Sequence, residues 1–247
     1  YRVKDFPYEH LVIDWMGNQI KVHGHFESGS PVEQIRFEDG SLYSLIGQNF
    51  VTKGTAGDDD FSGIDSADPD GFLPDDTMLG YAGNDALSGL GGADTLDGGE
   101  GDDALNGGTG NDIYLASNGH DIITENTGTD SIRFGEGVTL ADLSFQKVSD
   151  TPYLHLVITW GTSNQITIHD FFGNSTTTDK FIVESLLFAD GSVYDLTTEA
   201  LIQYGTAAAD TLLGVGSNTP EINPNDIMYG EDGNDTLTGS DGDDLLY

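Results

Sequence analysis

The sequence predicts an all-β fold, in which a parallel β-roll of nine-residue repeats alternates with β-rich capping segments. Three observations support this prediction. Aspartates recur every nine residues through the middle of the chain, and an apolar residue follows each of them two positions later. Glycine makes up 34 of the 247 residues, about twice its usual share. A strict short period of this kind is typical of a solenoid, in which each repeat packs against its neighbours.

The nine-residue repeat keeps its phase over seven rows. Its aspartates are Asp76, Asp85, Asp94, Asp103, Asp112, Asp121 and Asp130, and the residues two positions later are Met78, Leu87, Leu96, Leu105, Tyr114, Ile123 and Ile132. Glycines stand five positions before four of these aspartates (Gly80, Gly89, Gly98, Gly107) and two positions before six of them (Gly83, Gly92, Gly101, Gly110, Gly119, Gly128). The pattern is G-G-x-G-x-D-x-U-x with U apolar. We number its positions 1 to 9, so that aspartate stands at position 6.

The charge and composition exclude several classes of protein. Aspartate and glutamate number 43 against 8 lysines and arginines, which gives a formal net charge of −35. Such a chain cannot neutralise phosphates, so we exclude nucleic acid as a partner, and it lacks the basic clusters that bind anionic membranes. The absence of cysteine excludes disulfides and thiolate metal sites. No apolar run reaches the roughly 18 residues of a membrane span, and we therefore expect no transmembrane segment.

A longer repeat of about 150 residues is superimposed on the short one. Residues 37–43 return as 188–194, residues 18–23 return as 164–169, and residues 80–85 return as 230–235. We therefore expect the chain to be a fragment of a longer tandem array. The expected segments are the C-terminal capping part of a preceding unit (1–53), a β-roll (54–132), the β-rich cap of the same unit (133–204) and the start of the next roll (205–247).

The geometry of the predicted roll requires a cation. A six-residue turn and three extended residues form half a coil, so every second row stacks at about the 4.8 Å spacing of neighbouring strands. The U residues then point inward between two parallel sheets, and the aspartates line the edges. Two bare carboxylates at this spacing repel by roughly 3.5 kcal/mol at an effective dielectric constant of about 20. A divalent cation between rows reverses the sign, and carboxylate and carbonyl oxygens suit Ca²⁺ better than Mg²⁺.

Residues 80–112 resemble the RTX, or haemolysin-type, calcium-binding repeat. The resemblance implies a β-roll loaded with several Ca²⁺ ions, each shared by turns that are two repeats apart. It implies the pairs Asp76/Asp94, Asp85/Asp103, Asp94/Asp112, Asp103/Asp121, Asp112/Asp130 and Asp226/Asp244. The further metal-site residues that it implies are Asp59, Asp235, Gly80, Gly83, Gly89, Gly92, Gly98, Gly101, Gly107, Gly110, Gly230 and Gly233.

Some rows depart from the pattern. Tyr81 and Leu90 replace the second glycine, which we expect to be a mild change because only the backbone carbonyl is needed there. Residues 116–117 and 125–126 replace the glycine pair in the last two rows, which are therefore weaker candidates for a metal site.

Two further rows lie outside the nine-residue phase. Asp59 and Asp210 each stand at position 6 of a row that is followed by an irregular segment with prolines, 63–75 or 214–225. The spacing to the next repeat aspartate is 17 in the first case and 16 in the second. We interpret both as isolated rows.

The remainder of the unit alternates apolar and polar residues. Residues 154–160 and 165–168 are expected to form strands around a turn at Gly161, and residues 181–188 lead into a second turn and a short strand. This block resembles the β-rich segment that often follows RTX repeats, and it would cover the open end of a roll, whose exposed edge otherwise invites pairing with other chains. Residues 197–204 are expected to form one or two helical turns.

A zinc site and a catalytic site are two alternative interpretations of the histidines in the capping segments. His23 and His25 lie two apart on one predicted strand, but the repeat places Phe171 at the position equivalent to His25, which argues against a zinc pair. His169 and Asp170 are sequence neighbours without any nucleophile motif, so we expect no catalytic site and no enzyme activity. The repeat-equivalent pairs His10/His155 and Trp15/Trp160 are expected to pack inside the caps.

The resemblance implies a calcium-binding structural module of a secreted or cell-surface bacterial protein, which folds on extracellular calcium after type I secretion. Extracellular calcium modules bind at about 10⁻⁴ to 10⁻³ M, so the chain would stay unfolded inside the cell. The tandem unit favours a spacer or array in an adhesin or surface filament. An appendage of an extracellular protease, lipase or epimerase, or of a toxin, stays open. The expected partners are calcium and neighbouring repeat units or identical subunits, with any cell-surface or matrix partner unknown.

Overall fold

The computed structural model describes residues 2–5, 8–15, 18–23, 34–36, 42–44, 51–63, 73–150, 153–172, 183–214, 225–240 and 242–247, and all structural statements concern these residues. Nearly every regular element is a β-strand; a single 3₁₀ turn, η1 (Leu140–Asp142), is the one helical element of the described part. The all-β prediction is therefore confirmed. None of the helical segments in these ranges is long and apolar enough to cross a membrane.

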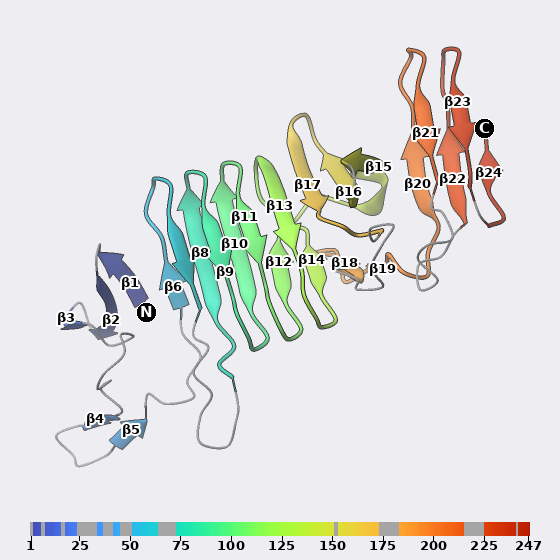
Figure 1. Cartoon of the computed structure of the whole chain (residues 1–247). Helices are drawn as coiled ribbons and strands as arrows, with labels where there is room; N and C mark the ends of the chain where they lie inside the picture. The colour runs from blue at the N-terminus through green and yellow to red at the C-terminus, as the bar shows by residue number, and fades with distance from the viewer. Residues whose placement is uncertain are drawn as a thin grey trace.

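Residues 51–63 and 73–133 form a roll of two parallel sheets that face each other (Figure 1). One sheet contains β6 (Val51–Lys53), β8 (Thr77–Ala82), β10 (Thr95–Glu100), β12 (Ile113–Leu115) and β14 (Ser131–Arg133). The other contains β7 (Asp60–Ser62), β9 (Ala86–Ser88), β11 (Ala104–Asn106) and β13 (His120–Thr124). Leu96 lies opposite Met78 and Tyr114, so one coil takes two repeats, as the sequence period predicts.

The U residues fill the space between the two sheets. Met78, Leu96, Tyr114, Ile123 and Ile132 have no exposed surface, and Leu87 and Leu105 are 2% exposed. Successive residues of a strand point to opposite sides, so one residue in each three-residue strand enters the core and its neighbours face outward. The core of the roll is consequently one side chain thick on each side, which leaves little apolar burial to offset the charge on its edges.

Two rows that the sequence places out of phase are stacked in the roll, so their interpretation as isolated rows is wrong. β7 pairs in parallel with β9, with Phe61 opposite Leu87. β21 (Thr211–Leu213) pairs in parallel with β23 (Thr236–Thr238), with Leu212 opposite Leu237. The backbone pairing is thus kept although the chain between the paired rows is longer than one regular coil.

The cap continues both sheets of the roll. β15 (Leu143–Asp150), β16 (Tyr153–Trp160) and β17 (Asn164–Ile168) form an antiparallel meander whose last strand pairs in parallel with β13. β18 (Ser185–Leu187) and β19 (Val193–Asp195) form a hairpin, and β18 pairs in parallel with β14. The strands around Gly161 and the second hairpin were predicted, whereas β15 was not.

Aromatic side chains pack together in the cap, directly after the last strand of the roll. The Phe134 ring meets Trp160 edge-on at 5.3 Å between centroids and stacks on Phe188 at 5.5 Å. All three are at most 8% exposed, which confirms Trp160 as a packing residue. Rings in these arrangements add about 0.5–1.5 kcal/mol beyond the area that they bury.

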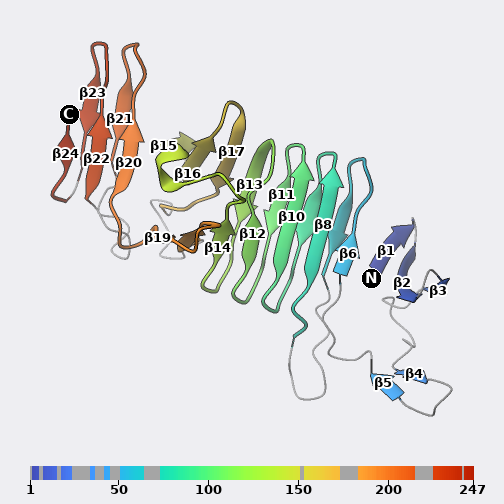
Figure 2. The same cartoon turned by 180° about the vertical axis from the view of Figure 1, so that it is seen from behind.

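A second roll begins after the cap, at the C-terminal end of the chain in Figures 1 and 2. It contains the parallel strands β20 (Leu201–Tyr204), β22 (Asp226–Tyr229) and β24 (Leu245–Leu246), together with β21 and β23. The helical turns predicted for 197–204 are wrong over 201–204, where the chain forms β20. Leu201 and Gln203 are buried and the strand pairs along its whole length with β22, so tertiary pairing decides its conformation.

The strands of the N-terminal segment repeat those of the cap. They are β1 (Arg2–Asp5), β2 (Tyr8–Trp15) and β3 (Asn18–His23), with a separate hairpin of β4 (Gln34–Arg36) and β5 (Leu42–Ser44). β2 and β3 are the repeat equivalents of β16 and β17, and β4 and β5 are those of β18 and β19. β1 pairs in parallel with β6, next to the first roll. His25 of the zinc alternative lies outside the described residues.

Candidate metal sites

The aspartates stack in two series, one along each edge of the first roll. We call Asp59, Asp85, Asp103 and Asp121 the first edge, and Asp76, Asp94, Asp112 and Asp130 the second edge. In each series the backbone N–H of one aspartate donates to Oδ1 of the next, at 2.8, 2.8 and 3.2 Å on the first edge and at 2.6, 2.7 and 2.8 Å on the second. Asp226 donates to Asp244 in the same way at 2.9 Å, and Asp210 donates to Asp235 at 3.0 Å.

All six aspartate pairs expected from the resemblance are therefore brought together, and the structure adds Asp59/Asp85 and Asp210/Asp235. The carboxylates do not face one another bare, as the repulsion argument assumed. A backbone N–H lies between successive carboxylates and satisfies one oxygen of each. The other carboxylate oxygen, Oδ2, is then the one that a cation would bind.

That other oxygen is buried and has no hydrogen-bond partner in the middle of the roll. It is Oδ2 of Asp85, Asp94, Asp103 and Asp112, four residues that are at most 2% exposed. A buried anionic oxygen without a partner costs several kcal/mol, which is why buried charges are paired or bind metal ions. These four oxygens are the strongest structural indication that the edges of the roll bind cations.

A second kind of oxygen converges on each of these carboxylates. A Cβ atom added to Gly89 would lie 2.6 Å from the carbonyl oxygen of Gly107 and would also collide with Asp94 Oδ2. Gly80 has the same relation to Asp85 and to the carbonyl of Gly98. The glycine at position 1 thus leaves room in which a carboxylate and a carbonyl from the next coil meet. An oxygen-only set of this kind fits Ca²⁺, which accepts six to eight oxygens in flexible geometry.

All of the predicted position-1 glycines lie against the Oδ2 atom of the aspartate five residues later, so that an added Cβ would collide with it. These glycines are Gly80, Gly89, Gly98, Gly107 and Gly230. The predicted position-4 glycines, Gly83, Gly92, Gly101, Gly110 and Gly233, have φ between +117° and +139°. At Gly110, for example, a Cβ would overlap the carbonyl oxygen of Gly92 one coil earlier. Position 4 is therefore restricted to glycine both by its backbone conformation and by the contact between coils.

Position 2 also has a positive φ, which the sequence analysis underestimated. Tyr81 has φ +79° and Leu90 has φ +74°, where Gly99 and Gly108 have +101°. A side chain in this region costs roughly 1–2 kcal/mol, so the two replacements are not mild.

Burial raises the pKa of the edge carboxyls. The pKa of Asp94 rises to about 7, mainly by desolvation, although the bond from the Asp76 N–H opposes the rise and neighbouring aspartates add to it. The pKa of Asp130 rises to about 7 and that of Asp121 to about 6 for the same leading reason. The ionised form of these groups is thus unfavourable in the roll without a cation, and a bound cation would restore it.

Hydroxyl groups close both ends of the first edge. In these end rows a hydroxyl side chain at position 2 donates to Oδ2 of the aspartate of the same row. In the middle rows this Oδ2 atom has no hydrogen-bond partner. The bonds are Thr55 to Asp59 at 3.0 Å and Ser117 to Asp121 at 2.9 Å, with Thr206 to Asp210 at 2.9 Å in the second roll. Asp59 and Asp121 are the first and last members of this edge. Their Oδ2 atoms already have a partner, so they are weaker candidates for ligands than Asp85 and Asp103.

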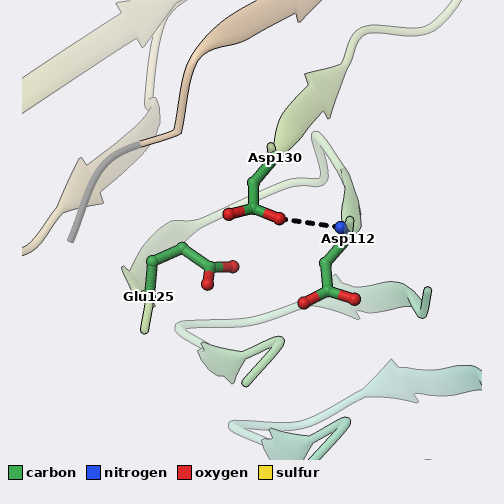
Figure 3. Close-up of side chains that lie close together, drawn as sticks. All are labelled: Asp112, Glu125 and Asp130. Atoms are coloured by element: carbon green, nitrogen blue, oxygen red, sulfur yellow. Dashed lines mark hydrogen bonds between the residues drawn. The ribbon is translucent and has the colours of Figure 1, made fainter. Parts of the chain in front are cut away.

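The second edge ends in glutamates, which the sequence analysis did not identify as site residues. Glu184 Oε2 accepts the Asp130 N–H at 2.6 Å and so takes the place of a further aspartate. The pairing of β18 with β14 brings it there from a distant part of the chain, and no local pattern announces it. Glu125 stands at position 1, and its carboxylate lies with those of Asp112 and Asp130 (Figure 3).

A lysine from the cap contacts the start of the second roll. Lys147 Nζ donates to the carbonyl oxygen of Gly214 at 2.9 Å and lies 5.2 Å from the centre of the Phe172 ring. Burial lowers the pKa of this ammonium, and Asp226 nearby opposes the decrease. A Cβ on Gly214 would collide with Asp226 Oδ2 and with the carbonyl oxygen of Gly239. Gly214 therefore has the same relation to Asp226 as the position-1 glycines of the first roll have to their aspartates.

The histidines of the cap serve packing and turn geometry. His155 is 7% exposed, its Nδ1 accepts the backbone N–H of Asp170 at 3.1 Å, and its ring lies 4.5 Å from that of His169. His155 is thus confirmed as a packing residue. It contacts Asp170 through the backbone N–H rather than through the carboxylate.

Comparisons with known proteins agree with this geometry. The family model described as the RTX calcium-binding nonapeptide repeat matches four times, at residues 75–105, 88–123, 106–138 and 225–247. The model described as the haemolysin-type calcium binding protein related domain matches residues 155–198, within the cap. No curated protein matches the sequence.

Proposed function

Because the chain belongs to the RTX family of haemolysin-type calcium-binding repeat proteins, we propose that it is a secreted structural module whose folding is coupled to extracellular calcium. Its repeats bind Ca²⁺ and form a parallel β-roll. The observation that carries the coupling is the set of buried, unpartnered Oδ2 atoms of Asp85, Asp94, Asp103 and Asp112. Cations bound at these atoms would neutralise carboxylates that only the folded chain buries.

The proposed ligands are the edge aspartates together with the carbonyl groups at position 1. One carboxylate oxygen is held by the backbone of the preceding coil, so the second is directed by the fold rather than by the ion. Only the folded chain brings successive coils into contact, and the unfolded chain therefore lacks these sites. A ligand at 100 times its Kd stabilises the folded state by about 2.7 kcal/mol per independent site, so a few ions suffice to drive folding.

We further propose that this coupling serves export and assembly. A chain with a net charge of −35 stays expanded where calcium is scarce, which suits type I secretion of an unfolded protein, and it folds outside the cell. Two rolls separated by a cap in one chain support a role as a repeated spacer in an adhesin or surface filament rather than as an enzyme. The proposed segments are 1–53, 54–132, 133–204 and 205–247.

The experiment that tests the proposed function is a far-UV circular dichroism titration of the chain with Ca²⁺, with Mg²⁺ as the matched control. We expect a cooperative change from disordered to β-sheet signal near millimolar Ca²⁺ and none at equal Mg²⁺. A complete β-sheet spectrum in excess chelator would refute the coupling between calcium and folding.

A further inference from the structure

Three buried carboxylates meet at the last row of the second edge (Figure 3). Asp112, Glu125 and Asp130 are each 1% exposed, and each offers a carboxylate oxygen within 4.8 Å of the other two. Asp112 and Asp130 belong to the repeating series, but Glu125 occupies position 1, where Gly107 stands one coil earlier. This row therefore adds a third carboxylate at a place where other rows have only a carbonyl.

Tyr114 and the backbone hold Glu125 in place. The Tyr114 hydroxyl donates to Glu125 Oε1 and accepts the N–H of Gly107 at 2.6 Å. Glu125 Oε2 accepts the N–H of Asn126 at 2.9 Å. Tyr114 is completely buried, so its ring cannot turn away without opening the core. The glutamate is thus oriented before any ligand binds, with lone pairs left on both oxygens.

An independent observation indicates a cation in this cluster. Asp112 Oδ2 is buried and has no hydrogen-bond partner. It lies beside the Tyr114 hydroxyl, since both contact the place that a Cβ on Gly107 would take. The hydroxyl has one proton and donates it to Glu125, so nothing neutralises Asp112 Oδ2 from the protein side.

We propose that Asp112, Glu125 and Asp130 form a calcium site that differs from the repeating sites and fills first. The inference deepens the proposed function and rests on it. Calcium affinity increases with the number of charged ligands and with the rigidity of the site, and this site has three carboxylates and a glutamate oriented by Tyr114. Asp130 also donates its N–H to Glu184 of the cap, so binding here joins the last coil of the roll to the cap.

The test is a calcium isotherm measured by titration calorimetry, with bound calcium counted by elemental analysis, for wild type and three variants. Glu125→Gln removes the charge and keeps the shape, whereas Glu125→Gly restores the repeat residue. Glu136→Gln is the matched control, because Glu136 is exposed and the change in net charge is the same. We expect Glu125→Gln and Glu125→Gly to weaken the tightest binding step at least tenfold, and Glu136→Gln to leave it unchanged.

Two results would overturn the inference. An isotherm of Glu125→Gln that superimposes on that of Glu136→Gln would show that Glu125 is no ligand. One additional ion bound by Glu125→Gly would show that the glutamate fills a repeating site instead of building a new one. In both cases the calcium-induced change in circular dichroism would persist, so the proposed function would stand, whereas loss of that change in wild type would refute the proposed function itself. If Glu125→Gln does not fold at saturating calcium, Glu125→Gly gives the same comparison.

Discussion

Asp94→Asn separates the two roles of an edge aspartate. The Asp94 carboxylate is completely buried; Oδ1 accepts the Asp76 N–H at 2.6 Å, and Oδ2 has no partner. Asparagine keeps the accepting oxygen, and its amide N–H₂ replaces Oδ2, next to the carbonyl group of Gly107. The substitution therefore removes a negative charge without removing the hydrogen bond that aligns successive coils.

The magnitude follows from the pKa of Asp94. Burial raises it from 3.8 to about 7, and three pKa units correspond to about 4 kcal/mol of unfavourable ionisation in the calcium-free roll. The asparagine variant avoids this cost, so its calcium-free roll becomes more stable by up to about that amount. The calcium-bound roll loses a charged ligand, so we expect fewer bound ions and a folding transition that depends less steeply on calcium.

The assay is a set of urea denaturation curves at several calcium concentrations, with circular dichroism spectra in chelator and a count of bound calcium. The control is Asp102→Asn, which makes the same change in charge at an exposed residue whose Oδ1 accepts the His120 N–H at 2.9 Å. Asn84 makes the equivalent bond at that position one coil earlier, so the fold accepts asparagine there. Equal ion counts and equal calcium dependence for Asp94→Asn and Asp102→Asn would refute the reasoning.

Three further predictions concern pH, close packing and the contact between the rolls. The folded-state pKa values of Asp94 and Asp130 are near 7, above the unfolded value of 3.8, so the calcium-free roll binds more protons than the unfolded chain. The stability of this roll is therefore full below about pH 4 and falls as the pH rises towards 7. Circular dichroism in chelator should show more β-structure at pH 5 than at pH 7.5, and the opposite trend would contradict the burial of these groups. Gly110→Ala should destabilise the roll by more than about 3 kcal/mol in calorimetric or urea unfolding, because the added Cβ overlaps a backbone oxygen. The control Gly137→Ala is also at positive φ but has no atom within 4 Å of the added Cβ, so it should cost only about 1–2 kcal/mol. Equal losses of stability would show that contact between coils is unimportant. Lys147→Met removes a charged hydrogen bond worth about 1.5–3 kcal/mol. It should raise the calcium concentration needed to protect the amides of β22 from hydrogen exchange and leave the protection of the β10 amides unchanged. Unchanged protection of β22 would show that the lysine does not stabilise the second roll.

The period of the sequence predicted the interior of the roll well. Met78, Leu96 and Tyr114 stack in register because two repeats return the chain to the same place, and the same arithmetic brings Asp94 beside Asp112. These relations are local and repeated, so they can be recognised from spacing alone. The direction of the carboxylates was harder to predict, because it depends on a backbone N–H from the preceding coil that enters between them.

The ends of the roll were predicted less well. Glu184 closes the second edge from a distant hairpin, and β20 is extended because β22 pairs with it, although the local sequence favoured helical turns. Glu125 was recognised only as a departure from glycine. The orientation of its side chain depends on Tyr114, a core residue of the preceding coil whose hydroxyl donates a hydrogen bond to the Glu125 carboxylate.

The sequence by itself determined the coil length, the apolar ladder of the core, the stacking of the aspartates and the binding of calcium. A repeated local pattern imposes the same backbone geometry at every row, so one row predicts the next. Only the tertiary structure decided where the series ends and what closes it: hydroxyl groups on the first edge, glutamates on the second, and Lys147 at the start of the next roll. The last coil has no successor to pair with, and its neighbours are supplied by non-local segments that no period encodes.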